Sequence, residues 1–241
     1  MGIVETLIKK VLEKGTITYK EQLSESVYKV RIKGAHIRNV DFKPGYFVRL
    51  GVGIGQEDLS IKDKVRSYSV WDINRENETI DLAIATHSGG IGANWVKNCQ
   101  TDTTVHFKWK KGNFLLDDQA DSYLMIGDLS ALSHLYMIKR NLPAEKQIES
   151  IIYSQDMTEL FADVDGKTPF NFYEMEQNPF EEIQLKLEEL LAKLKGTKMV
   201  YIAGDSRLCL ALNQYFRKQL NWSTKQIKTK PFWNPEKKGL E

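Results

Sequence analysis

The spacing of apolar and polar residues divides the chain into two parts with different periods. In the first part, apolar and polar residues alternate over short runs separated by turn residues, and this pattern predicts β-strands. The predicted strands cover residues 16–19, 27–32, 46–50, 66–71, 79–86 and 103–109. Because no long helix separates these strands, they favour a closed or nearly closed antiparallel barrel of the Greek-key type.

An amphipathic helix is predicted ahead of the barrel, over residues 3–14. Ile3, Leu7 and Val11 fall on one face of this helix, and Gly15 is a natural stop. We expect the apolar face to dock on the rest of the protein.

After Asp118 the pattern changes to strands that alternate with helices. Continuous apolar runs predict buried strands at residues 122–127, 148–154 and 199–203, and helical periodicity predicts helices at 129–141, 180–194 and after 205. Strands joined by helices imply right-handed crossovers and a parallel sheet, which is a doubly wound α/β fold. We therefore expect two domains, at residues 1–117 and 118–241.

Composition and charge exclude several classes of protein. Charged residues make up 27% of the 241 residues and the net charge is only +2, which argues against a dedicated nucleic-acid binder. No apolar run approaches the length of a membrane span, and the acidic residues near the N-terminus are unlike a signal peptide, so a cytoplasmic protein is expected. Cys99 and Cys209 are far apart and belong to no CxxC motif, so both are predicted to be free thiols and no metal site is predicted.

The stretch from Val65 to Trp95 carries the candidate chemistry. Arg66 can bind phosphate oxygens through two N–H groups, and Tyr68 lies on the same strand face two residues further on. A glycine-rich turn at residues 88–92 then opens an apparent helix, whose N–H groups suit a pyrophosphate. The alternative is an ordinary half-buried strand followed by a hairpin.

Five motifs in this order resemble those of the siderophore-interacting proteins, a family of ferredoxin-reductase-like flavoproteins. The motifs are Arg66-Ser67-Tyr68-Ser69, His87 with Gly90-Ile91-Gly92-Ala93-Asn94-Trp95, the strand-to-helix turns at 125–132 and 200–205, and the aromatic and basic ending at 232–239. The chain departs from the family pattern at four positions, which carry Trp71 in place of a second arginine, Ile91 in place of proline, Ala93 in place of a small hydroxyl residue and Asp205 in place of glutamate.

The resemblance implies an N-terminal FAD-binding barrel, a C-terminal NAD(P)H-binding-like domain and a set of site residues. The expected cofactor-binding residues are Arg66, Ser67, Tyr68, Ser69, Thr86, His87, Gly90, Gly92, Ala93, Asn94, Trp95, Asp128 and Trp233. Lys108, Lys110 and Lys111 are expected to bind an anionic iron chelate. The hydroxyl of Ser69 is expected near the reactive edge of the flavin ring. No protein acid, base or nucleophile is expected to take part.

Three residues keep a second interpretation. His87 can be a structural hydrogen-bond donor, and Asp128 and Asp205 can be helix N-caps. Neither strand-to-helix turn has the full G-x-G-x-x-G phosphate motif, so binding of a nicotinamide dinucleotide is supported by the layout of the chain alone. Ferredoxin is an alternative electron donor.

The function expected from the resemblance is reduction of Fe(III) in ferric-siderophore complexes, with release of Fe(II). FAD would be the cofactor, NAD(P)H or ferredoxin the electron donor, and the protein a monomer that binds neither nucleic acid nor membrane. Two alternatives stay open: a flavin or ferredoxin-type reductase with another acceptor, and a siderophore-binding protein without redox activity.

Overall fold

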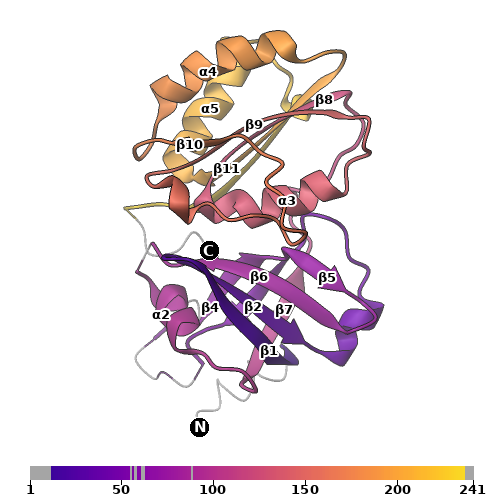
Figure 1. Cartoon of the computed structure of the whole chain (residues 1–241), viewed down its shortest axis with the longest axis vertical. Coiled ribbons are helices and arrows are strands. Elements are labelled where there is room, and N and C mark those ends of the chain that lie inside the picture. The colour runs from indigo at the N-terminus through magenta and orange to yellow at the C-terminus, as the bar shows by residue number, and fades with distance from the viewer. Residues whose placement is uncertain (1–11, 55, 57–58, 61–62, 88, 237–241) are drawn as a thin grey trace. The chain divides into compact units, whose positions relative to one another are not determined.

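The structure is a computed structural model, and it describes residues 12–236 except 55, 57–58, 61–62 and 88. The chain divides into two compact units, with the boundary between Leu115 and Leu116. Figure 1 follows the chain through both units, from indigo at the N-terminus to yellow at the C-terminus. Each unit is built around one sheet of its own.

The first unit is a seven-stranded antiparallel sheet with the strand order β4-β3-β7-β1-β2-β6-β5. Its strands are β1 (Glu13–Ser24), β2 (Val27–Lys33), β3 (Phe47–Gly51), β4 (Val65–Ser69), β5 (Asp72–Asn74), β6 (Thr79–Ala85) and β7 (Thr104–Lys110). Strand β7 lies between β3 and β1, so strands that are distant in sequence are neighbours, as in a Greek key.

This sheet is closed into a barrel by the chain itself. Its two edge strands, β4 and β5, are consecutive in sequence, and only Val70 and Trp71 separate them. The backbone N–H of Trp71 donates a 2.8 Å hydrogen bond to the carbonyl of Asp81 on β6. The barrel-like unit predicted from the sequence is therefore confirmed. Its interior contains fully buried apolar side chains, among them Ile17, Val30, Ile32, Val48, Leu50, Ile80, Leu82 and Phe107.

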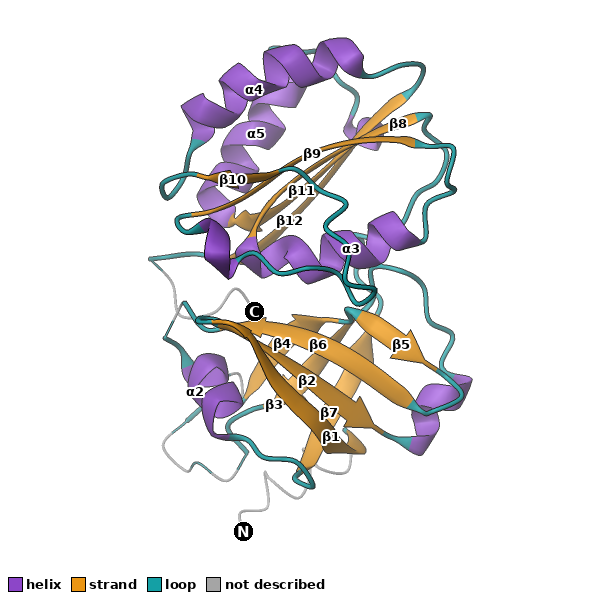
Figure 2. Ribbon diagram, viewed as in Figure 1, coloured by secondary structure: helices purple, strands orange, loops and turns teal. Residues whose placement is uncertain are grey.

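Two helical segments accompany the barrel strands in the described part of the first unit. They are the 3₁₀ turn η1 (Ala35–Asn39) and the α-helix α2 (Ile91–Asn98). Helix α2 follows β6 and lies beside the strands in Figure 2. It buries Gly92, Ala93 and Val96, while Asn94 and Lys97 on its other face are exposed.

The second unit is a five-stranded parallel sheet with the strand order β10-β9-β8-β11-β12. Its strands are β8 (Ser122–Asp128), β9 (Gln147–Ser154), β10 (Phe172–Glu174), β11 (Lys198–Asp205) and β12 (Ile227–Trp233). The helical segments are η2 (Leu129–Ala131), α3 (Leu132–Arg140), η3 (Met157–Glu159), α4 (Phe180–Lys193), α5 (Ser206–Lys218) and η4 (Thr224–Gln226). Figure 2 shows α3 on one face of the sheet and α4 and α5 on the other, which confirms the predicted doubly wound fold.

The middle of this sheet is covered on both faces. All seven residues of β8 are buried, and so are seven of the eight residues of β11. Ile126, Ile202 and Leu187 belong to one apolar cluster that joins the sheet to α4 and α5. Continuous apolar runs are the sequence pattern of strands buried on both faces, and this explains why these strands were predicted correctly.

Several predicted boundaries were wrong. Most of the helix predicted at residues 3–14 lies outside the described residues, but Glu13 and Lys14 begin strand β1, so the helix cannot continue to Gly15. The strand predicted at 66–71 ends at Ser69, because the chain turns at Val70 and Trp71 to reach β5. The three strands β5, β10 and β12 were not predicted. Among the described residues, no helix is long and apolar enough to cross a membrane.

Candidate functional site

The two predicted flavin motifs meet in the first unit. Tyr68 on β4 lies against Gly92 in the first turn of α2, so closely that a Cβ at position 92 would overlap the tyrosine hydroxyl. The side-chain stem of Arg66 passes the same point, with its Cγ 3.7 Å from where that Cβ would be. The residues of the two motifs are therefore neighbours in space, although 24 positions separate Tyr68 from Gly92.

Arg66 is held at the start of β4 and is half-buried. Its Nη1 donates hydrogen bonds to the carbonyls of Val65, at 2.8 Å, and Asp63, at 3.1 Å. Its Nη2 lies 3.6 Å from the carboxylate of Asp63. These contacts hold the guanidinium at the start of β4. A guanidinium carries a fixed positive charge and five N–H donors, which suit it to binding an anion.

The N-terminus of α2 has the features of an anion-binding helix end. Gly90 is the N-cap and offers no side chain, and the first turn contains no acidic residue. The first helical hydrogen bond runs from Asn94 N to Gly90 O, at 3.0 Å. The N–H groups ahead of Asn94 have no carbonyl partner within the helix, and together with the helix dipole they favour negative charge.

The other residues of the two motifs have different environments. Tyr68 is half-buried, and Ser67 and Ser69 project from the opposite face of β4 because side chains alternate along a strand. Thr86 is buried, and both its N–H and its hydroxyl donate to the carbonyl of Ser26. His87 is exposed in the turn that follows β6. In helix α2, Ala93 is buried, Trp95 is half-buried and Asn94 is exposed.

These residues fit a flavin dinucleotide. Its pyrophosphate needs charge and N–H donors, which Arg66, whose side-chain stem passes Gly92, and the first turn of α2 supply. Its ring needs an aromatic or apolar surface, and Tyr68 is an aromatic side chain beside those donors. The glycine at position 92 keeps the space between β4 and α2 free of a side chain.

The predicted substrate lysines extend along β7. Lys108 and Lys110 lie on one face of the strand because they are two residues apart, and Lys111 follows the end of the strand. Lys108 is paired across the sheet with Arg49 on β3. The register therefore places two basic residues directly opposite each other on this part of the sheet. Arg49 was missed in the sequence, although a lone arginine inside the apolar strand around it was a usable signal.

The two predicted site residues of the second unit contact each other. Asp128 ends β8 and Trp233 ends β12, and the indole N–H of Trp233 donates to Oδ2 of Asp128 at 2.8 Å. The same oxygen accepts from Asp205 N at 2.7 Å, and Oδ1 accepts from the backbone N and the hydroxyl of Ser130. Asp128 is only 7% exposed. The carboxylate therefore acts as an N-cap and a tie between strands, and any role of Asp128 and Trp233 in binding a cofactor stays a prediction.

Asp205 is likewise an N-cap. Its Oδ1 accepts from Arg207 N at 2.9 Å, and its Oδ2 pairs with the Arg207 guanidinium at 2.6 Å. Asp128 and Asp205 stand at the carboxyl ends of β8 and β11, the neighbouring strands at which the order of the sheet reverses. Open α/β sheets bind their ligands at this position.

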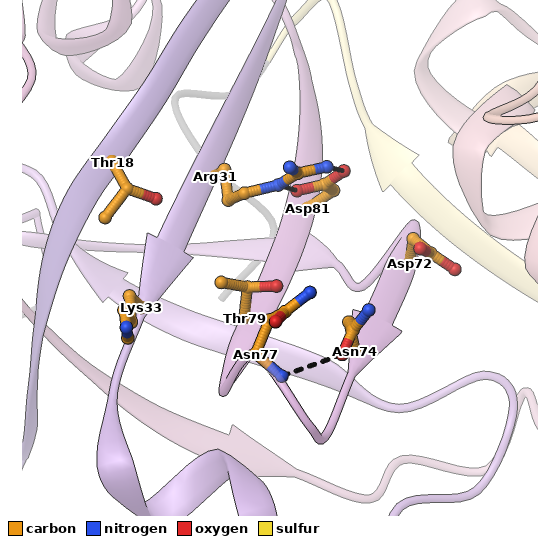
Figure 3. Close-up of a pocket in the computed structure, with 8 residues that line it drawn as sticks. All are labelled: Thr18, Arg31, Lys33, Asp72, Asn74, Asn77, Thr79 and Asp81. Atoms are coloured by element: carbon orange, nitrogen blue, oxygen red, sulfur yellow. Dashed lines mark hydrogen bonds and ion pairs between the residues drawn. The ribbon is translucent and has the colours of Figure 1, made fainter.

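A separate hollow of about 380 Å³ lies in the first unit. Figure 3 shows its lining, in which Arg31 forms two hydrogen bonds with Asp81 and the side chain of Asn74 accepts from the backbone of Asn77. All the lining residues are polar: Thr18, Arg31, Lys33, Asp72, Asn74, Asn77, Thr79 and Asp81. Flavin rings and other cofactor rings occupy mostly apolar pockets, and no predicted site residue lines this hollow, so it is not the candidate flavin site.

The described residues contain no cluster of three or more metal-ligating side chains. Cys99 and Cys209 are both buried free thiols, as predicted. Burial raises the pKa of each thiol, and for Cys99 the ammonium of Lys20 opposes that rise.

Comparison with known proteins first defines the class. Residues 14–115 match the family model of the oxidoreductase FAD-binding domain. The fold is similar to that of the ferredoxin-NADP⁺ reductase of Plasmodium falciparum, with a TM-score of 0.70 and 15% identity over 93% of this chain and 97% of that one. The fold and the first unit thus define a ferredoxin-reductase-like flavoprotein.

A second family model matches the second unit. Residues 120–236, nearly all of the second unit, match the family model named siderophore-interacting protein. The siderophore-interacting protein of Acinetobacter baumannii has a similar structure, with a TM-score of 0.76 and 17% identity over 92% of this chain and 90% of that one. The ferric vibriobactin reductase ViuB of Vibrio cholerae is 21% identical over 89% of this chain and 86% of its own length.

Proposed function

We propose that the protein is an FAD-dependent oxidoreductase that reduces Fe(III) in ferric-siderophore complexes and so releases Fe(II). The observation that carries this proposal is the contact of Tyr68 with Gly92, which joins an arginine, an aromatic ring and an uncapped helix N-terminus into one clamp. The match of residues 120–236 to the siderophore-interacting protein model and the similarity to a ferric vibriobactin reductase support iron chelates as the substrate class.

Each part of the clamp has a separate task in this proposal. Arg66 and the first N–H groups of α2 bind the pyrophosphate, and Tyr68 lies against the ring. The predicted contact of the Ser69 hydroxyl with the ring edge gains no support from the strand geometry, because Ser69 projects from the face of β4 opposite Tyr68. A bound flavin supplies the conversion of a two-electron hydride into single-electron transfer. The remaining predicted contacts, at Ser67, Thr86, His87, Gly90, Ala93, Asn94 and Trp95, lie in the same two motifs.

The substrate needs charge and no acid or nucleophile from the protein. Oxygen ligands of a siderophore hold Fe(III) much more tightly than Fe(II), so that one electron loosens the complex. A group of basic residues on β3 and β7 would attract an anionic chelate. It consists of Arg49, Lys108, Lys110 and Lys111.

We assign the electron donor to the second unit. Its parallel sheet offers a switch point at the ends of β8 and β11, which supports NAD(P)H, while ferredoxin is the alternative donor. In functional terms we divide the chain into an FAD-binding part at 1–117 and an NAD(P)H-binding-like part at 118–241. A fragment that ends at Asp117 should therefore still bind FAD, and a folded fragment without affinity would contradict this division.

The proposed substrate indicates the cellular compartment in which the protein acts. An imported chelate has to be reduced inside the cell, and two buried free thiols are consistent with the reducing cytoplasm. We propose that the protein acts there as a monomer.

The first test concerns the cofactor. Replacing Arg66 by alanine removes a charge-assisted contact of about 1.5–3 kcal/mol, so FAD should be lost on dialysis. Arg38, an exposed arginine paired with Glu78, provides the matched control in Arg38→Ala. Equal flavin content in both folded variants would show that Arg66 does not bind the cofactor.

The second test concerns the reaction. The protein is loaded with FAD under anaerobic conditions and receives NADH, NADPH or reduced ferredoxin in separate trials, followed by a ferric siderophore and a ferrous trap. One donor should bleach the flavin absorbance, and the chelate should restore it with release of Fe(II). Bleaching without reoxidation by the chelate would favour a reductase with another acceptor. Failure to take up FAD at all would favour a siderophore-binding protein without redox activity.

A further inference from the structure

The hairpin formed by β1 and β2 contacts both ends of the segment that contains α2. At the entrance to the segment, the carbonyl of Ser26 accepts from Thr86 N at 2.7 Å and from the Thr86 hydroxyl at 3.0 Å. At its exit, the ammonium of Lys20 donates to the carbonyls of Lys97 and Cys99, both at 2.9 Å. One hairpin therefore fixes the two ends of a segment that is some 60 to 80 positions away in sequence.

Lys20 is itself held in place. It lies on β1, is half-buried, and its Nζ is 5.3 Å from the centre of the Tyr28 ring on β2. This distance allows a cation–π interaction. The contact with Tyr28 thus orients the ammonium of Lys20 on the barrel. Its two hydrogen bonds then fix the C-terminal end of α2 relative to the barrel.

The charges around α2 are distributed unevenly. Its C-terminal carbonyls carry partial negative charge, and they meet the ammonium of Lys20 while Lys97 adds a second cation in the last turn. Its N-terminal N–H groups carry partial positive charge, and the first turn contains no acidic residue and no side-chain cap. The protein thus compensates the negative end of the helix dipole and leaves the positive end available to an anion.

We propose that Lys20 is a positioning residue for the phosphates of the flavin. It holds the axis of α2 so that the N–H groups of the first turn keep a single direction beside Arg66, without touching the cofactor itself. The inference rests on the proposed FAD site, and it adds a residue that lies at the opposite end of the helix from the ligand. It predicts that phosphate binding depends on Lys20 while contact with the flavin ring does not.

The test compares FAD with riboflavin, which lacks phosphate, in the full-length protein. Lys20→Met keeps the apolar stem and removes the charge and both hydrogen bonds. It should weaken FAD binding about three- to tenfold, the range of a favourable helix-end charge, and leave riboflavin binding unchanged. Lys20→Arg keeps the cation and should bind FAD within about twofold of wild type on the same scale. Lys14→Met on the same strand is the matched control, because the side chain of Lys14 is exposed and makes no hydrogen bond or ion pair with the described residues.

The outcomes separate this inference from the proposed function. If the wild-type protein binds no FAD, the proposed site itself fails and the role of Lys20 falls with it. If wild type binds FAD and Lys20→Met binds it equally well, only the role of Lys20 is refuted. Equal weakening of FAD and riboflavin would show a general loosening of the barrel and would also refute it. Should Lys20→Met not fold, Lys20→Ala, which also removes the charge and both hydrogen bonds, is judged by the same criteria.

Discussion

The indole N–H of Trp233 donates a 2.8 Å hydrogen bond to Oδ2 of Asp128, and this contact joins the end of β12 to the end of β8 across 105 positions of sequence. Strand β11 lies between the two strands, and its last residue, Asp205, donates its own N–H to the same oxygen. One carboxylate thus ties together the carboxyl ends of three parallel strands. The backbone that follows β12 leaves the sheet at a point fixed by this bond.

Trp233→Phe removes the donor and keeps an aromatic ring. Because hydrogen bonds to charged groups contribute about 1.5–3 kcal/mol, we expect the free energy of unfolding to fall by about that amount. Trp222→Phe is the control, since the Trp222 ring packs on Phe216 and its indole N–H has no hydrogen bond among the described residues. Chemical denaturation of single and double variants with Asp128→Asn measures the coupling. Additive effects would show that the bond contributes nothing to stability.

Gly204 is required by the same carboxylate. Its φ angle is +124°, and a Cβ at this position would overlap the side chain of Asp128. We expect Gly204→Ala to destabilise the protein by about 3 kcal/mol or more, because backbone strain of about 1–3 kcal/mol adds to the overlap. Gly166→Ala is the control. The φ angle of Gly166 is also positive, at +79°, but a Cβ there would meet no other atom, so this variant should lose only the free energy of backbone strain. Equal losses of stability in the two variants would contradict this explanation.

Acid should weaken the turn that leads into β11. The backbone N–H and the hydroxyl of Thr197 both donate to Oδ2 of Asp121 at 2.8 Å, and these bonds hold the pKa of the Asp121 carboxyl below its usual range. An unfolded aspartate has a pKa of about 3.9, so the folded state binds fewer protons near that pH. The stabilisation is therefore complete above about pH 5 and is lost as the pH falls through the lowered pKa.

The measurement compares unfolding midpoints of wild type and Asp121→Asn between pH 6 and pH 3. The difference between the two curves should shrink as the pH falls, because the asparagine does not titrate. Asp41→Asn serves as the control, since Asp41 is exposed and makes no hydrogen bond with the described residues. A difference that stays constant with pH would show that the carboxyl is not perturbed by Thr197.

The sequence predicted those strands and helices whose residues follow one clear pattern of apolar and polar positions. Strands β8, β9 and β11 are apolar because they are buried, and this signal is local. Strand β12 was missed because its sequence, IKTKPFW, places lysines and a proline on an edge strand, where only one neighbour has to be paired. Strands β5 and β10 have three residues each, too few for a period to be visible.

The candidate site was predictable to the extent that its residues are close in sequence. Arg66, Tyr68 and Gly92 were singled out by motif, and the structure brings these three together. The bond between Trp233 and Asp128, the pair of Arg49 with Lys108 and the contact of Lys20 with α2 depend on strand order and register. No spacing within the sequence specifies that order, which is set by how the whole sheet closes.

The closest contact within the clamp offers its most specific test. A Cβ at Gly92 would overlap the Tyr68 hydroxyl and lie 3.2 Å from the ring carbon that bears it, so Gly92→Ala must displace either the ring or the helix. Overpacking of this kind costs about 1–3 kcal/mol, and because both elements are proposed to bind FAD we expect its affinity to fall about tenfold. Flavin fluorescence on titration with FAD measures the loss.

Tyr68→Phe distinguishes a steric effect from a chemical one at this contact. In the Gly92→Ala background it removes the overlapping oxygen, and the remaining 3.2 Å approach needs a shift of only a few tenths of an ångström, so most of the FAD affinity should return. Tyr68→Phe alone keeps the ring and should bind FAD within about threefold of wild type. If the double variant binds FAD no better than Gly92→Ala, the loss does not arise from this contact, and Tyr68 and α2 do not form one clamp.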